Sequence, residues 1–238
     1  MNLGILAAGD GQRLKDEGII DPKPLLRVGG ITLLERALKI TDDYGFDSCN
    51  IIINDKFKDD VINSRIFDNY KNLIINCIYK STLSSLHSLN ELDLFLSNDS
   101  FCLMTIDSIY SESEFASFIK TARDEAEYDG LIAVTGYVDD EKPLWVNTDK
   151  DNIITEFSSI KDDANFVTGG IYYFRKGIID YTDEALLNNI SKLRNFLQYL
   201  VESGIRLKAM SFSKIIDLDH KNDLVEAVRF LKEMEKSS

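Results

Sequence analysis

The first thirty residues, MNLGILAAGDGQRLKDEGIIDPKPLLRVGG (1–30), decide how the rest of the sequence is interpreted. An apolar run at 3–8 has the composition of a buried strand, and it passes directly into a loop with two glycines and an arginine at 9–13. Lys23 follows between two prolines. In an open α/β sheet, ligands bind beyond the carboxyl ends of strands, where glycines let backbone N–H groups approach an anion. The stretch therefore predicts a strand followed by an anion-binding loop.

The first half of the chain alternates apolar runs with amphipathic segments. The apolar runs are expected to be buried strands, at 3–8, 48–54, 72–79 and 100–106. The segments between them have helical spacing of apolar residues or capping residues, at 31–45, 83–96 and 111–128. Such alternation implies right-handed crossovers and a mostly parallel sheet.

The pattern changes after about residue 130. Short apolar stretches with turn-like gaps predict a partly antiparallel meander, at 130–138, 143–148, 152–160 and 166–174. Further elements are expected towards the end: helices at about 176–187 and 191–203, a strand at 205–212, the IIDLDH segment at 215–220 and a last helix at 221–236. No Pro/Gly/Ser-rich linker separates the two halves, so we expect one α/β domain with a small β-rich lobe.

Composition excludes several classes of partner. The 40 acidic residues exceed the 27 basic ones, for a net charge of -13, which argues against nucleic acid or an anionic membrane surface. We expect no signal peptide, and no apolar run approaches the roughly 20 residues that span a bilayer. Cys49, Cys77 and Cys102 each lie in an apolar stretch and are expected to be free thiols. These features predict a cytoplasmic protein.

The opening loop does not match two common phosphate-binding motifs. It lacks the G-K-[ST] of a Walker loop, and it lacks the third glycine of the dinucleotide fingerprint. A Gly-x-Gly after a strand also occurs in ordinary turns. The ordered combination is more specific: a strand, LAAGDGQRL (6–14), a gap, PKPLLRVGG (22–30) and then a helix.

This combination resembles the signature of the nucleotidyltransferases, the family that makes nucleotide-sugars and related activated alcohols. The resemblance implies a Rossmann-like mixed, mostly parallel sheet of the nucleotide-diphospho-sugar transferase type with a small β-rich acceptor lobe. It also implies a division of one domain, 1–238, into an NTP-binding half (1–130), an acceptor lobe (131–212) and a metal-binding segment with the C-terminal helix (213–238).

The resemblance gives the opening loop a role in holding the triphosphate. Arg13 and Lys23 are expected to be catalytic, through contacts with the phosphates. The expected nucleotide-binding residues are Leu6, Ala7, Ala8, Gly9, Gly11, Thr82 and Ser85. The last two belong to STLSSL (81–86), which matches the family's base- and ribose-lining segment except that serine replaces its glycine. The simpler interpretation of those hydroxyls is an N-cap of an amphipathic helix.

Metal ligands are expected at strand ends, because cleaving a triphosphate requires Mg²⁺ to neutralise charge. Asp107 follows the apolar run at 100–106, although an aspartate there could also be a turn or cap residue. IIDLDHKNDL (215–224) resembles the family's late acidic segment and offers Asp217 and Asp219. Branches of the family differ over which of these two binds metal, so both stay candidates. Asp223 is expected to lie in the first turn of the last helix.

The acceptor site is expected in the later lobe. VTGGIYYF (167–174) resembles a family strand whose small residues let the acceptor approach, which makes Gly169 and Gly170 candidates. Lys161 is the candidate for the family's acceptor-phosphate lysine. Thr168 departs from the usual Asn.

The resulting hypothesis is transfer of NMP from an NTP to a small phosphorylated acceptor, a sugar 1-phosphate first, with Mg²⁺ and release of pyrophosphate. One alternative is a cytidylyltransferase for phosphocholine or an aminoalkylphosphonate. Another is a non-catalytic nucleotide sensor. The presence of three candidate metal carboxylates argues against this second alternative. The sequence leaves the base, the acceptor and the oligomeric state open.

Overall fold

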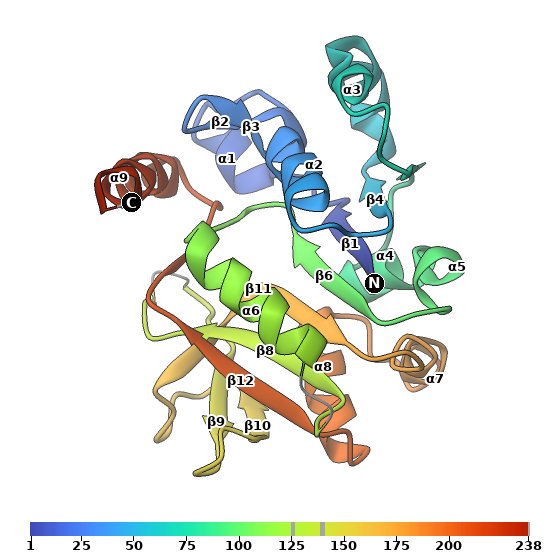
Figure 1. Cartoon of the computed structure of the whole chain (residues 1–238), viewed down its shortest axis with the longest axis vertical. Coiled ribbons are helices and arrows are strands. Elements are labelled where there is room, and N and C mark those ends of the chain that lie inside the picture. The colour runs from blue at the N-terminus through green and yellow to red at the C-terminus, as the bar shows by residue number, and fades with distance from the viewer. Residues whose placement is uncertain (125–126, 139–140, 238) are drawn as a thin grey trace.

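The computed structural model describes residues 1–124, 127–138 and 141–237, and side chains up to 236 (Figure 1). Within this part of the chain, nine strands form one mixed sheet that is covered on both faces by helices. The predicted fold class is confirmed. The end of the helix expected over 111–128 includes 125–126, which lie outside the described residues.

Four parallel strands form the half of the sheet that contains the opening loop. In spatial order these are β5 (Ile75–Tyr79), β4 (Cys49–Ile53), β1 (Asn2–Ala7) and β6 (Phe101–Thr105). The strand that begins the chain is therefore central, with parallel neighbours on both sides. Its carboxyl end lies at the switch point of the sheet, where α/β proteins bind ligands.

The other half of the sheet turns antiparallel at one long strand. This strand, β11 (Phe166–Phe174), pairs antiparallel with β6. It also pairs with β8 (Gly130–Thr135) and β9 (Trp145–Thr148). β8 pairs in turn with β12 (Leu207–Phe212), and β9 pairs with β10 (Ile154–Ser158). The expected meander is confirmed as this antiparallel part.

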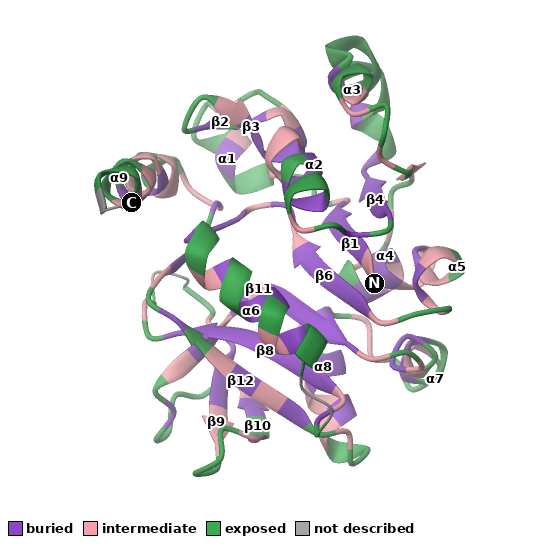
Figure 2. Cartoon of the chain, in the orientation of Figure 1, coloured by how far each residue is buried: buried purple, intermediate pink, exposed green. Residues whose placement is uncertain are grey.

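Alternation of side chains along the strands divides the core in two. On β6, Cys102 and Met104 point to one helical layer, and Phe101 and Leu103 point to the other. Both faces of the sheet are thus buried, as Figure 2 shows by the purple colour of the central strands. This explains why these strands are continuously apolar rather than alternating.

The helices fall into the two layers according to their apolar faces. The first layer contains α2 (Leu33–Asp43), α6 (Glu112–Asp124) and α9 (Lys221–Ser237). The second contains α4 (Ser85–Glu91), α5 (Asp93–Leu96), α7 (Tyr181–Leu187) and α8 (Leu193–Glu202). The other described helical elements are short. They are helices α1 (Gln12–Asp16) and α3 (Lys58–Ser64) and 3-10 turns at Lys23–Leu25, Asp55–Phe57 and Ile66–Asn69. No described helix is long and apolar enough to cross a membrane.

Two boundaries differ from the sequence expectation. The helix expected over 83–96 is divided into α4 and α5 at Leu92. The helix expected from 176 begins only at Tyr181, because Gly177 has a φ of 93°, a conformation outside the helical region.

Two small ribbons flank the main sheet. β7 (Ser108–Tyr110) pairs antiparallel with β13 (Ile215–Asp217), and Asp217 lies opposite Ser108. β2 (Arg27–Val28) pairs with β3 (Ile31–Thr32). Asp107 immediately precedes β7, so the first ribbon brings it close to Asp217, although the two candidate metal ligands are 110 positions apart in sequence.

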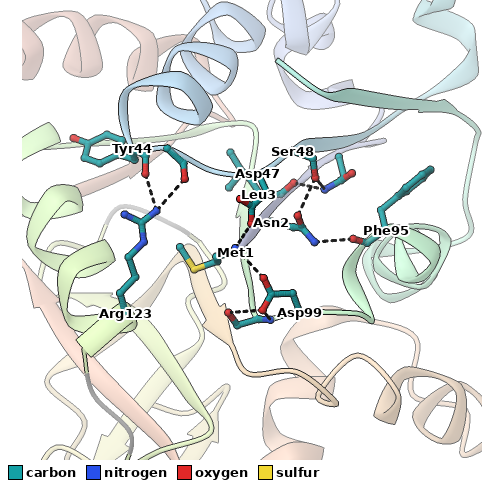
Figure 3. A network of polar contacts seen from close by, with 12 residues as sticks. Met1, Asn2, Leu3, Tyr44, Asp47, Ser48, Phe95, Asp99 and Arg123 are labelled. Atoms are coloured by element: carbon teal, nitrogen blue, oxygen red, sulfur yellow. Dashed lines mark hydrogen bonds and ion pairs between the residues drawn. The ribbon is translucent and has the colours of Figure 1, made fainter. Parts of the chain in front are cut away.

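Polar side chains close the amino end of the sheet, opposite the opening loop (Figure 3). Asn2 donates to the Phe95 carbonyl at 3.0 Å and accepts from the Ser48 hydroxyl at 3.0 Å. Arg123 donates to the Tyr44 carbonyl at 2.7 Å, which connects α6 to the end of α2. These contacts fix the end of the sheet that carries no candidate site residue.

Candidate active site

The opening loop leaves the sheet at the carboxyl end of β1. Gly11 has a φ of 63° and precedes α1, so a left-handed backbone is required there. Gly9 differs, because a Cβ added to it would meet nothing within 4 Å. Protein packing therefore does not explain Gly9, and the space beside it opens to a cavity.

A cavity of about 590 Å³ lies against this loop. It is bounded by the ends of β1, β4 and β6 and by the segment that leads into α4. Eleven residues singled out from sequence line it: Leu6, Ala7, Ala8, Gly9, Gly11, Arg13, Lys23, Thr82, Ser85, Asp107 and Asp219. We call it the nucleotide cavity.

A second cavity of about 230 Å³ lies next to it, on the β11 side. Gly169, Gly170 and Asp217 line this cavity. Ser85 and Thr105 line both cavities, so the two spaces adjoin. We call the second one the acceptor cavity.

Lys23 lies where the candidate carboxylates converge. Its side chain is only 9% exposed, and its Nζ lies 2.5 Å from Asp107 Oδ2 and 3.0 Å from Asp219 Oδ1. Arg13 Nη1 lies 2.6 Å from the other oxygen of Asp219. Two cations and two carboxylates, far apart in sequence, thus form one chain of ion pairs along the nucleotide cavity.

The electrostatics of this cluster follow from burial and from its neighbours. Burial opposes the charge on Lys23, but Asp107 and Asp219 outweigh it and raise the pKa of the ammonium. Burial likewise opposes the charge on Asp107, but Lys23 lowers the pKa of that carboxyl. Desolvation by the surrounding protein atoms, together with repulsion from Asp107, raises the pKa of the Asp217 carboxyl well above its ordinary value, although the residue as a whole is exposed.

A side chain of the following helix, α9, fixes the backbone at Asp219. Asp223 Oδ2 accepts from the backbone N–H of Asp219 at 2.9 Å and of His220 at 2.6 Å. Asp223 lies in the first turn of α9, as expected. His220 Nδ1 lies 2.6 Å from Glu17 Oε1, which connects the segment to the end of α1.

Thr82 and Ser85 line the nucleotide cavity, but both also have partners within the protein. The Thr82 hydroxyl lies 2.6 Å from the Ser88 hydroxyl. Ser85 Oγ accepts from the Leu193 backbone N–H at 2.9 Å and so connects α4 to the start of α8. Neither hydroxyl caps α4, whose N-cap is Ser84.

The glycines of β11 are explained in part by protein packing. A Cβ on Gly169 would collide with Ile215, and one on Gly170 would collide with the hydroxyls of Thr105 and Ser108. Gly170 also has a φ of 72°. Absence of side chains there lets β11 approach the ribbon that contains Asp217.

Lys161 lines neither cavity. Its Nζ lies 5.1 Å from the centre of the Trp145 ring, a cation–π contact at the edge of the lobe. The cations that do line the acceptor cavity are Lys192 and Arg194, from the start of α8. Neither residue was predicted from the sequence, since SKLR (191–194) carries no motif.

Asn54 is a further residue of the nucleotide cavity that the sequence analysis missed. It is 5% exposed and follows β4 directly. The rule that singled out Asp107, a polar residue immediately after an apolar strand, would also have found Asn54.

The residues present fit a divalent cation that is completed by substrate oxygens. Among the described residues, no group of three or more His, Cys, Asp and Glu side chains is ready to hold a metal by itself. Asp107 Oδ1, however, is buried and has no hydrogen-bond partner in the described part of the chain. A bound cation would satisfy this oxygen, and Mg²⁺ commonly takes only one or two carboxylates, with phosphate oxygens and water as its other ligands.

Comparisons with known proteins identify the family and the fold. The sequence profile of the family described as Nucleotidyl transferase matches residues 4–234. The inositol-1-phosphate CTP transferase of T. maritima superposes with a TM-score of 0.81 at 19% identity, covering 98% of this chain and 96% of its own. A Bacillus anthracis protein assigned as a glucose-1-phosphate thymidylyltransferase gives 0.82 at 18% identity, with the same coverage. HddC from Yersinia pseudotuberculosis gives 0.73 at 23%, covering 97% and 99%.

Proposed function

The chain belongs to the nucleotidyl transferase family and is a nucleotidyltransferase, and we propose that it transfers NMP from an NTP to a small phosphorylated acceptor, with release of pyrophosphate. The observation that carries the proposal is the cluster of Lys23, Arg13, Asp107 and Asp219 between a glycine loop and a second, adjoining cavity. Residues 1–130 would bind the NTP, residues 131–212 the acceptor, and residues 213–238 would supply Asp217 and Asp219.

The reaction is an in-line displacement at the α-phosphorus. An acceptor phosphate oxygen forms the new P–O bond while the bond to pyrophosphate breaks. Because a phosphate oxygen is already anionic at neutral pH, no general base is required. The chain must instead position both phosphates and balance their charge, which is the main source of catalysis in phosphoryl transfer.

The ion pairs of the cluster would exchange partners when substrate binds. Arg13 and the loop amides would hold the β- and γ-phosphates, and Lys23 would contact the phosphate at the reacting centre. Asp107, with Asp219 or Asp217, would hold Mg²⁺, whose chemistry is to neutralise charge on the triphosphate as the bond breaks. Bound Mg²⁺ would also favour the charged form of Asp217, whose pKa is raised without it.

The acceptor phosphate is best matched by the cations at the start of α8. Lys192 and Arg194 line the acceptor cavity, whereas Lys161 does not. Arg194 is held by a 3.0 Å bond from its Nη2 to the Lys142 carbonyl. We therefore propose Arg194 and Lys192, in place of Lys161, as the acceptor-phosphate ligands.

A hydroxylated acceptor fits this cavity better than phosphocholine does. Its lining is rich in hydroxyl groups: Ser85, Thr105, Thr135, Tyr137, Thr168 and Tyr172. Quaternary ammonium groups are commonly bound by exposed aromatic faces. The Tyr137 face already carries the Lys214 ammonium, 4.0 Å from the ring centre, and Tyr172 is only 5% exposed and stacks on Phe174. A sugar or polyol phosphate is therefore the favoured acceptor class.

The proposal is tested by thermal unfolding with CTP, UTP, GTP, ATP and dTTP, each with and without Mg²⁺. A ligand at about 100 times its Kd stabilises the folded state by about 2.7 kcal/mol. For a chain of this length, that raises the melting temperature by roughly 5 to 11 °C. One NTP with a metal-dependent shift supports the assignment and names the base. No shift with any nucleotide would leave the glycine loop as an ordinary turn and refute the proposal.

A further inference from the structure

Asn54 connects the three loops that surround the nucleotide cavity. It stands directly after β4, between the loop that follows β1 and the loop that follows β5. Its side chain is 5% exposed, and it lines the nucleotide cavity.

All four hydrogen-bonding positions of the Asn54 amide are used. Nδ2 donates to the Ala8 carbonyl at 2.9 Å and to Asp10 Oδ1 at 3.2 Å. Oδ1 accepts from the Ser81 hydroxyl at 3.1 Å and from the Lys56 backbone N–H at 3.3 Å. An amide has two N–H donors and two acceptor lone pairs, so the side chain is fully satisfied. Its orientation is fixed as well, because the Ala8 carbonyl can only accept and the Lys56 N–H can only donate.

The bond to Ala8 extends the sheet into the loop. Backbone pairing between β1 and β4 ends at Ala7 opposite Ile53. One residue further along each strand, the Asn54 side chain bonds the Ala8 carbonyl. The first loop residue is thus held in line with β1, although the chain has left the ladder. The next residue, Gly9, has no protein atom near its absent side chain, so this bond fixes the direction in which the loop begins.

We propose that Asn54 is the positioning residue that holds the glycine loop in its phosphate-binding conformation and so sets the affinity for the NTP. The inference rests on the proposed function for the identity of the ligand. Asn54 acts through the loop and touches no reacting atom. A preorganised loop loses less conformational freedom when the triphosphate binds, so loss of the Ala8 bond should weaken binding.

The same strand offers a matched control. Asn50 is fully buried on β4 and donates from Nδ2 to the Leu3 carbonyl of β1 at 3.1 Å. It thus makes the same kind of bond, but to a carbonyl within β1 rather than to the loop that follows it, and it lines neither cavity. Loss of either bond affects β1–β4 packing, but only Asn54 touches the loop.

The variants are Asn54→Asp and Asn54→Ser, each paired with the same change at Asn50. Aspartate keeps the acceptor oxygens and removes both N–H donors. Serine is neutral and can still accept from the Lys56 N–H as a cap, but it is too short to reach Ala8. The serine pair keeps the comparison valid if a buried aspartate prevents folding, and thermal unfolding confirms that each variant is folded.

The first readout is hydrogen–deuterium exchange of peptides that cover residues 6–14, which needs no ligand. We expect about tenfold faster exchange of loop amides in both Asn54 variants, and no change there in the Asn50 variants. The second is the Kd of the most strongly bound of the five NTPs with Mg²⁺. We expect a rise of about tenfold or more in the Asn54 variants and a change within about twofold in the Asn50 variants.

Unchanged loop exchange in the Asn54 variants overturns the inference, whatever the nucleotide result. Faster exchange with an unchanged Kd also overturns it, because the loop would then not set affinity. If the wild-type protein binds none of the five nucleotides, the proposed function fails, and the exchange experiment still decides whether Asn54 holds the loop.

Discussion

Replacing Lys23 with methionine tests the ion-pair cluster most sharply. Methionine keeps most of the volume of the side chain and removes its charge. The Nζ of Lys23 is the partner of Asp107 at 2.5 Å, and the Lys23 side chain is 9% exposed against 17% for Asp107. Removing one partner of a buried pair leaves the other charge uncompensated, which typically costs about 3 to 5 kcal/mol. Asp219 also loses Lys23 as a partner, but its side chain is 36% exposed, so solvent largely screens its uncompensated charge.

The expected loss for Lys23→Met is therefore about 3 to 5 kcal/mol of unfolding free energy at pH 7. For a chain of this size, this corresponds to a fall of roughly 6 to 20 °C in melting temperature. The assay is urea unfolding of wild-type and variant protein at a series of pH values. Turnover should fall by about a thousandfold or more, because a buried cation at the reacting centre is lost.

The pH dependence has a definite sign. Lys23 lowers the pKa of Asp107 below its ordinary 3.8, so this pair stabilises the fold fully only above that value. The contribution is lost as the pH falls through the folded pKa. The difference between wild type and Lys23→Met should thus be at its full size near neutral pH and shrink only as the pH falls below about 3.8. Adding Asp107→Asn to the variant should restore stability without restoring turnover. Equal stability of Lys23→Met and wild type at pH 7 would refute this account of the cluster.

Three further predictions concern packing, pH and the acceptor. Gly170→Ala should destabilise the fold by about 1 to 3 kcal/mol in urea unfolding, since its φ is 72° and the new Cβ meets two hydroxyls; an unchanged midpoint would contradict this. Glu17 raises the pKa of His220, and His220 lowers the pKa of Glu17. The stability lost in His220→Asn should therefore be greatest between about pH 4.5 and 6.5 and vanish as the pH rises through the folded pKa of His220; a pH-independent difference in urea unfolding would argue against the pair. Arg194→Ala should raise the KM for the acceptor phosphate about tenfold or more, and Lys161→Ala should leave it unchanged; the reverse pattern would restore Lys161 as the ligand.

The sequence predicted the parts of the site that depend on strand ends. LAAGDGQRL (6–14) follows a strand, and so does Asp107, and the carboxyl ends of parallel strands meet at one edge of a sheet. Asp217 and Asp219 both remain candidates, and they lie at different cavities. Asp217 ends β13 and faces the acceptor cavity, whereas Asp219 lies two residues further on and faces the nucleotide cavity.

The acceptor side could not be predicted in the same way. Which cation reaches the cavity depends on how α8 packs against the lobe, and no periodic pattern around Lys161 or Arg194 encodes that packing. The glycines of β11 were ambiguous for a different reason. A glycine can make room for a ligand or for protein, and only the structure shows that Ile215 occupies the space beside Gly169.

The chain itself would supply only some of the ligands of the proposed metal site. The carboxylates are placed by β6, by β13 and by the segment before α9, but Lys23 lies between two of them. Phosphate oxygens would complete the coordination, and the described residues hold no complete set of ligands that could be recognised.

The measurement that tests the central claim most directly is pyrophosphate release. The wild-type protein is incubated with the NTP that shifts its melting temperature, a panel of sugar and polyol phosphates and phosphocholine, with Mg²⁺ or with a chelator, and the Lys23→Met variant serves as the control. The account predicts pyrophosphate in equal amount to a new nucleoside-diphosphate product, only with a phosphorylated acceptor and Mg²⁺, and none from the variant. A protein that binds its NTP tightly but releases no pyrophosphate with any acceptor would contradict the account and make this chain a nucleotide sensor.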